Sequence, residues 1–154
     1  MTSYVNQPNY GNPYGQRQES RPQVKRVEIG GFYSEDGKLK LDLFDRKANE
    51  IADSIVGVTR TQLRRIFDEV KRFEQRLAVE TWDDVVPYVR MVKSKVSYQV
   101  ARAIDKNRST EGAYRNLSAF ITEGISLAGS EKDFRVFLSL FEAVYGFSYE
   151  KLKD

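Results

Sequence analysis

From residue 43 onward, hydrophobic residues recur every three or four positions, which is the spacing of one buried helix face. Glycines, a proline and capping residues divide this pattern into five segments. Helices are therefore expected at about 43–57, 59–77, 83–106, 110–128 and 130–146. Five helices joined by short connections predict an all-α fold, a compact helical bundle.

The ends and faces of these helices follow from the same pattern. Thr59 begins a capping box in which the Gln62 side chain reaches back to the Thr59 amide. Ser130 and Asp133 give the fifth helix a similar start, and Pro87 is expected in the first turn of the third helix or at a kink. The buried face of the first helix is expected to hold Phe44, Ala48, Ile51, Ala52 and Ile55.

The segments outside the helical pattern have a different composition. Residues 1–23 are rich in Asn, Gln, Tyr, Pro, Gly and Ser, which predicts a disordered tail because too little apolar surface is available to bury. Residues 24–42 are expected to form an extended lead-in or one short hairpin, with its turn at Glu35-Asp36-Gly37. The predicted organisation is thus a tail, this lead-in, a bundle over 43–147 and a C-terminal tail over 148–154.

Composition removes most catalytic chemistry. The 154 residues include no cysteine and no histidine, which excludes disulfides, thiolate metal sites and the commonest general base. Adjacent acids such as Asp83-Asp84 fall at helix starts, where negative charge is stabilising without any chemistry. We therefore expect no enzyme activity, no metal and no cofactor. The chain also shows neither a secretory signal nor an apolar run long enough to cross a membrane, which predicts a cytoplasmic protein.

Positive charge is concentrated in the middle of the chain. The net charge is +3, but residues 60–108 carry twelve basic and seven acidic residues, a local excess of +5. Such an excess on a helical surface attracts polyanions. Helical positions place Arg60, Arg64 and Lys71 on one flank of the second helix, and Arg65, Arg72 and Arg76 on its outer face.

The third helix shows a similar division. Lys95, Arg102 and Lys106 share one flank with Tyr88 and Gln99, and Lys93 lies across the hydrophobic stripe. Helix geometry thus makes Arg60, Arg64, Lys95, Arg102 and Lys106 candidate contacts with a nucleic-acid backbone. Tyr88 and Tyr98 are candidates for stacking on unpaired bases. The alternative is a helical protein–protein adaptor with no nucleic-acid role, in which these cations form ordinary surface ion pairs.

Three segments taken in order resemble a known family. They are TRTQLRRIF (59–67), MVKSKVSYQVARA (91–103) and FRVFLSLFEAVYGF (134–147). Together they resemble the small helical subunit of type III-A CRISPR–Cas effector complexes, the Csm complex. The basic positions that match its motifs are Arg64, Arg65, Lys93, Lys95 and Arg102, and the resemblance adds Lys93 to the candidate RNA-backbone contacts. Arg60 and Lys106 are added from helix geometry alone, which also favours Arg64 over Arg65 as a phosphate contact.

The resemblance implies a non-catalytic subunit that takes part in antiviral defence. Its copies would stack beside the guide-bearing subunits and contact the backbone of the target RNA without reading its sequence. The implied partners are single-stranded target RNA, the guide RNA and the other subunits of the complex, with a homodimer as a form of the isolated chain and no membrane. One departure is Ser97, which stands where a small apolar residue is expected before Tyr98.

Overall fold

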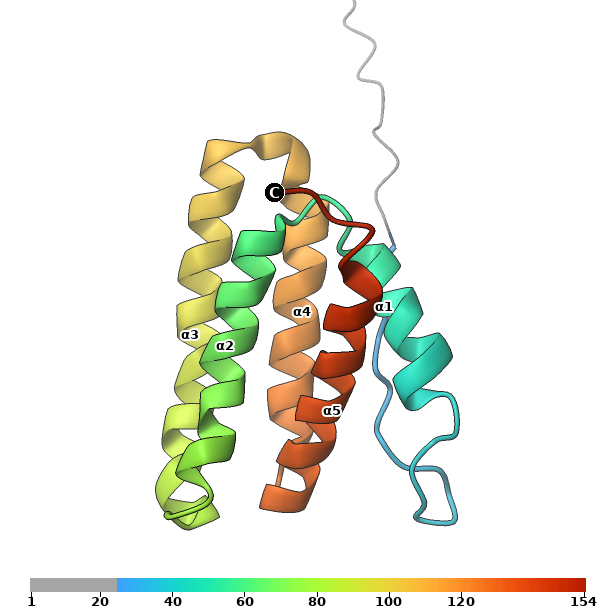
Figure 1. The fold of residues 1–154 in the computed structure, drawn as a ribbon, viewed down its shortest axis with the longest axis vertical. Coiled ribbons are helices and arrows are strands. Elements are labelled where there is room, and N and C mark those ends of the chain that lie inside the picture. Colours follow the sequence, from blue (N-terminus) through green and yellow to red (C-terminus); the bar gives the residue numbers. More distant parts are fainter. Residues whose placement is uncertain (1–24) are drawn as a thin grey trace, which may run out of the picture.

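Four long helices that alternate in direction form the bundle, in a computed structural model that describes residues 25–154 (Figure 1). They are α2 (Arg60–Arg76), α3 (Trp82–Lys106), α4 (Glu111–Leu127) and α5 (Glu131–Ser148). The shorter α1 (Ala48–Ser54) follows a π-helical turn, η1 (Leu43–Lys47), and packs beside α5; a 3₁₀ turn, η2 (Arg108–Thr110), joins α3 to α4. The predicted all-α bundle of about five helices is confirmed, and the tail predicted at 1–23 lies outside the described residues.

The core is built on aromatic rings contributed by α4 and α5. Phe120 lies 5.6 Å from Phe137 and 5.5 Å from Phe141 between ring centroids. One predicted core residue is wrong: Phe44 is 37% exposed, and Leu43, at 1%, takes the buried position. The reason is the π-helical turn η1, in which hydrogen bonds span five residues, so the regular α-helical step does not hold there.

Two of the predicted helix starts are confirmed. The hydroxyl oxygen of Thr59 accepts the Gln62 amide at 3.1 Å, and that of Ser130 accepts the Asp133 amide at 3.2 Å. The other half of the predicted capping box is different, because the Thr59 amide donates to the hydroxyl of Tyr114. One bound differs from expectation, because α5 continues past Gly146 to Ser148. Of the two positions expected for Pro87, the first turn of α3 is wrong, since Pro87 lies further inside the helix.

The cap at Ser130 gives a first testable prediction. Because its hydroxyl satisfies a backbone amide that has no partner within the helix, Ser130→Ala should lower the free energy of unfolding by about 1 kcal/mol. Ser139→Ala is the matched control, since Ser139 is exposed in the interior of α5 and should change stability little. Urea unfolding midpoints measure both, and equal midpoints for the two variants would contradict the capping role.

The lead-in packs onto the bundle. Ile29 and Phe32 are buried in the core, and the Glu123 carboxylate on α4 accepts the Ile29 amide at 2.7 Å. The Tyr33 hydroxyl donates to Asp133 on α5 at 2.6 Å, and this bond raises the pKa of Tyr33. Leu39 forms a single antiparallel bridge with Tyr33, so a tight turn without strands stands where a hairpin was one expectation.

The last residues also fold back on the bundle. Leu152 is buried, and the Lys153 carbonyl accepts the Arg60 amide at 2.9 Å. The Lys151 ammonium donates to Asp53 at 2.6 Å and to Asn49, both on α1. Residues 149–154 therefore tie the start of α2 to α1.

Candidate nucleic-acid interface

The register between α2 and α3 is fixed by two contacts across the helices. The Lys95 ammonium lies 3.3 Å from a carboxylate oxygen of Glu69, and the Arg76 guanidinium lies 4.7 Å from the ring centroid of Tyr88. The residue numbers of each pair add up to 164, as they must for antiparallel neighbours in constant register. Position 65 of α2 therefore lies opposite position 99 of α3.

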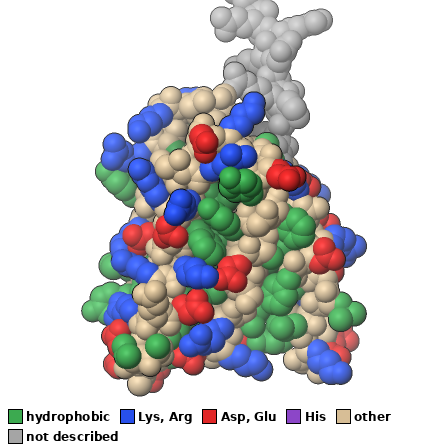
Figure 2. All heavy atoms as spheres, in the orientation of Figure 1, with side chains coloured by type: hydrophobic (Ala, Val, Ile, Leu, Met, Phe, Trp, Pro, Cys, Tyr) green, Lys and Arg blue, Asp and Glu red, His purple; other side chains and the backbone are tan. Residues whose placement is uncertain are grey.

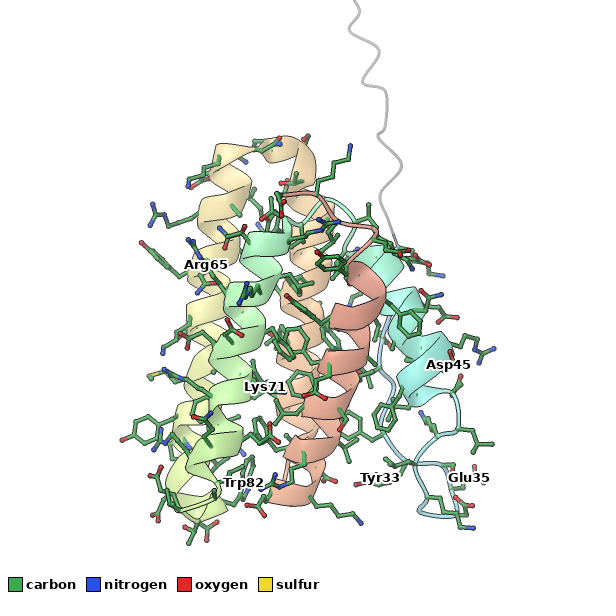
Figure 3. All side chains as sticks on the ribbon, in the orientation of Figure 1. Tyr33, Glu35, Asp45, Arg65, Lys71 and Trp82 are labelled. Carbon is green, nitrogen blue, oxygen red and sulfur yellow. The ribbon has the colours of Figure 1, made fainter. Side chains whose placement is uncertain are left out.

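Cations from both helices line this junction. On α2, Arg65, Arg72 and Arg76 share a side with Glu69, because they follow one another at intervals of three, four or seven residues. Figure 3 shows Arg65 where α2 lies beside α3. On α3, Lys95, Arg102 and Lys106 share the side that carries the contact to Glu69. We call these six cations the basic seam: Arg65, Arg72, Arg76, Lys95, Arg102 and Lys106.

Acidic side chains neutralise only part of the basic seam. Glu69 lies 3.3 Å from both Lys95 and Arg72, and Arg76 pairs with Glu80 at 2.7 Å. The hydrogen bond from Arg76 holds the pKa of the Glu80 carboxyl below its usual range. Within residues 25–154, no carboxylate lies at ion-pair distance from the remaining three cations, which are Arg65, Arg102 and Lys106.

Two predicted α2 contacts lie outside the basic seam. The Arg60 guanidinium donates to the Tyr149 carbonyl at 2.9 Å and stacks 4.4 Å from the Tyr149 ring, so it faces the end of α5. Arg64 points outward, with 74% of its side chain exposed and Asp68 3.9 Å away. The structure therefore does not bring Arg60 or Arg64 together with the α3 cations.

Lys93 is also separate from the other α3 candidates. Its ammonium donates to the Ser126 hydroxyl on α4 at 2.8 Å, on the opposite side of α3 from Lys95. The basic seam thus keeps three predicted contacts, which are Lys95, Arg102 and Lys106.

The α2 cations of the basic seam were not selected from the sequence, and one reason accounts for all three: Arg65, Arg72 and Arg76. The flank that carries Arg60 and Lys71 faces α5, where Lys71 forms an ion pair with Glu142 that raises the pKa of Lys71 (Figure 3). Because the sequence pattern identifies flanks but not which neighbour lies beside each, the side of α2 next to α3 was assigned to solvent. Arg65 was nevertheless a match to the family motif, which was the available signal for it.

Two tyrosines on α3 accompany the cations. Tyr98 is 63% exposed, and the Arg102 guanidinium lies 5.7 Å from its ring centroid. Tyr88 is about half exposed beneath Arg76. The two rings are ten residues apart on one helix, which corresponds to roughly 15 Å.

The surface as a whole mixes charges of both signs. Figure 2 shows Lys and Arg side chains along the α3 edge and at the end of the bundle where α3 meets α4, with acidic side chains between them. Such a surface can hold phosphates by charge but offers no cluster of acids for a metal, since none of three or more occurs among residues 25–154. None of the helices described here combines the length and apolar character that a membrane crossing requires.

The comparisons with known proteins give one match. The family model described as Csm2 Type III-A matches residues 38–151, which include all five helices and the three motifs. No curated protein and no solved structure matches the chain. The family match spans well over half of the 154 residues. The chain therefore belongs to the Csm2 family, and it is a structural subunit of a type III-A CRISPR effector complex.

Proposed function

We propose that this subunit binds the sugar-phosphate backbone of RNA along the basic seam, without sequence specificity and without a catalytic role. The ligand is the single-stranded target RNA and its duplex with the guide RNA, in the cytoplasm, as part of antiviral defence. Contacts with other subunits, and a homodimer of the isolated chain, belong to the same proposal. Leu41 and Val79 support such contacts because both present large apolar side chains to solvent.

The observation that carries the proposal is a row of six cations on two packed helices, of which three, Arg65, Arg102 and Lys106, have no carboxylate at ion-pair distance among the described residues. Lys95 and Arg102 are seven residues apart, which spaces their side chains by about 10 Å along α3. Both helices are fixed by buried residues, Ile66 and Val70 on α2 and Val96 on α3 among them, so the cations project from a rigid base. A row of this kind engages phosphates along one strand and carries no base information.

The test is a salt titration with a double charge reversal. Each phosphate contact with a single strand contributes about 0.7 to the slope of log affinity against log salt. Lys95→Glu with Arg102→Glu should therefore flatten the slope by about 1.4 and weaken binding to every sequence alike. Fluorescence anisotropy with labelled oligouridine and a second oligoribonucleotide of different sequence measures both, for the full chain and for the effector complex reconstituted around it.

A matched control has the same charge change elsewhere. Lys38→Glu with Arg135→Glu reverses two exposed cations, on the lead-in turn and on α5, away from the basic seam. This pair should leave the slope within error of the unaltered chain. Equal slopes for all three proteins, or no salt-dependent binding by either the chain or the complex, would overturn the proposal and favour the adaptor function.

A further inference from the structure

One side chain between the cations of the basic seam, that of Gln99, has an unmet hydrogen-bonding requirement. The carbonyl oxygen of Gln99 is buried and accepts no hydrogen bond, the one such side-chain atom among the described residues. A buried acceptor without a donor is disfavoured, and structures rarely retain one without a reason. Gln99 as a whole residue is only partly buried, and the terminal torsion of a glutamine side chain is broad, which leaves the amide group free to change its orientation.

The position of Gln99 indicates what donor it can meet. It lies on α3 between Lys95, four residues before it, and Arg102, three residues after it, and the register of the two helices places Arg65 opposite. All three neighbours are cations with donor groups, yet none of them bonds to the Gln99 carbonyl oxygen. When these cations turn toward phosphates, their donors are engaged and cannot serve this oxygen.

We infer that Gln99 recognises the ribose 2′-hydroxyl and makes the basic seam selective for RNA over DNA. In a nucleic-acid strand the sugars lie between the phosphates, as Gln99 lies between Lys95 and Arg102. The 2′-hydroxyl donates a hydrogen bond, and it is the group by which a protein distinguishes RNA from DNA. Cations alone bind RNA and DNA equally by charge, because both nucleic acids carry the same phosphates. This inference rests on the proposed function, since it needs a strand bound along the seam.

The experiment compares three labelled oligonucleotides of one sequence on the full chain. Oligouridine with ribose offers the donor, whereas the 2′-O-methyl and 2′-deoxy forms lack it at equal charge. The unaltered chain should bind the ribose form about 3- to 10-fold more tightly than both others, the range of one net hydrogen bond. Requiring both substituted forms to weaken excludes a steric effect of the methyl group.

The decisive variant is Gln99→Met, which keeps the length of the side chain and removes both hydrogen-bonding groups. It should bind all three oligonucleotides with equal affinity, at the level of the unaltered chain with the 2′-deoxy form. A ribose preference that persists in Gln99→Met overturns the inference. Equal binding of all three forms by the unaltered chain overturns it as well, and leaves the proposed function standing.

Failure of the proposed function would give a different experimental result from failure of the Gln99 inference. If no oligonucleotide binds in a salt-dependent manner, both proposals fail together. Lys95→Glu with Arg102→Glu separates the two contributions, because it should weaken the ribose and deoxyribose forms by similar factors. A circular dichroism melt confirms that each variant is folded, and Gln99→Leu provides a second apolar replacement should the methionine variant fail to fold.

Discussion

Gly124→Ala is expected to lower the free energy of unfolding by about 2 kcal/mol, although alanine is the better helix former. A β-carbon at Gly124 on α4 would lie 2.0 Å from one ring carbon of Phe137 and 2.3 Å from another. Phe137 is fully buried on α5 and packs against Phe120 and Phe141, so its ring has no free space to move into. Overpacking of this kind costs about 3 kcal/mol, which exceeds the gain in helix propensity of about 1 kcal/mol.

Gly146→Ala is the matched control. Gly146 lies within α5, and a β-carbon there would meet no atom within 4 Å. The substitution should raise the free energy of unfolding by about 0.5–1 kcal/mol, because alanine restricts the unfolded chain and suits the helix. Urea unfolding of the two variants should therefore shift the midpoint in opposite directions. A shift of both midpoints to higher urea would show that α4 and α5 are not in close contact at Gly124.

The sequence predicted the helices well because their signal is local. Val92, Val96 and Val100 recur at four-residue intervals, and all three are buried on the inner face of α3. The same reasoning failed at Phe44, where the backbone winds as a π-helical turn that no residue in the pattern announces. The packing of residues 25–42 also had no local signal, because Glu123 holds the Ile29 amide across 94 positions of the chain.

The candidate interface shows the same limit. Periodicity places Lys95, Arg102 and Lys106 on one face, because that grouping depends only on the geometry of a single helix, and the three residues do lie on one helix, α3. It could not decide which flank of α2 lies beside α3, because that depends on how the helices pack together. Arg65 was consequently assigned to solvent, and Arg60 was counted as a phosphate contact although it bonds to the Tyr149 carbonyl. The close approach of Phe137 to Gly124 could not be predicted either, because a glycine within a helical pattern does not indicate which residue packs against it.

The choice between the two flanks of α2 can be decided by neutralising each in turn. Arg65→Gln with Arg72→Gln removes two cations from the basic seam, whereas Arg60→Gln with Lys71→Gln removes two that face α5. The first pair should flatten the slope of log affinity against log salt by about 1.4. It should also weaken oligouridine binding by more than tenfold at low salt, because each charged hydrogen bond contributes about 1.5 kcal/mol or more.

The second pair should affect stability instead of binding. Arg60 bonds to the Tyr149 carbonyl and Lys71 pairs with Glu142, so their loss loosens the contact of α2 with α5 and lowers the urea midpoint. The salt slope should stay that of the unaltered chain, because neither side chain lies in the basic seam. If the α5-facing pair flattened the slope and the seam pair did not, RNA would have to lie along α2 and α5. Arg60 would then be a phosphate contact, as the sequence predicts, and the α2 half of the basic seam, with Arg65 and Arg72, would be wrong.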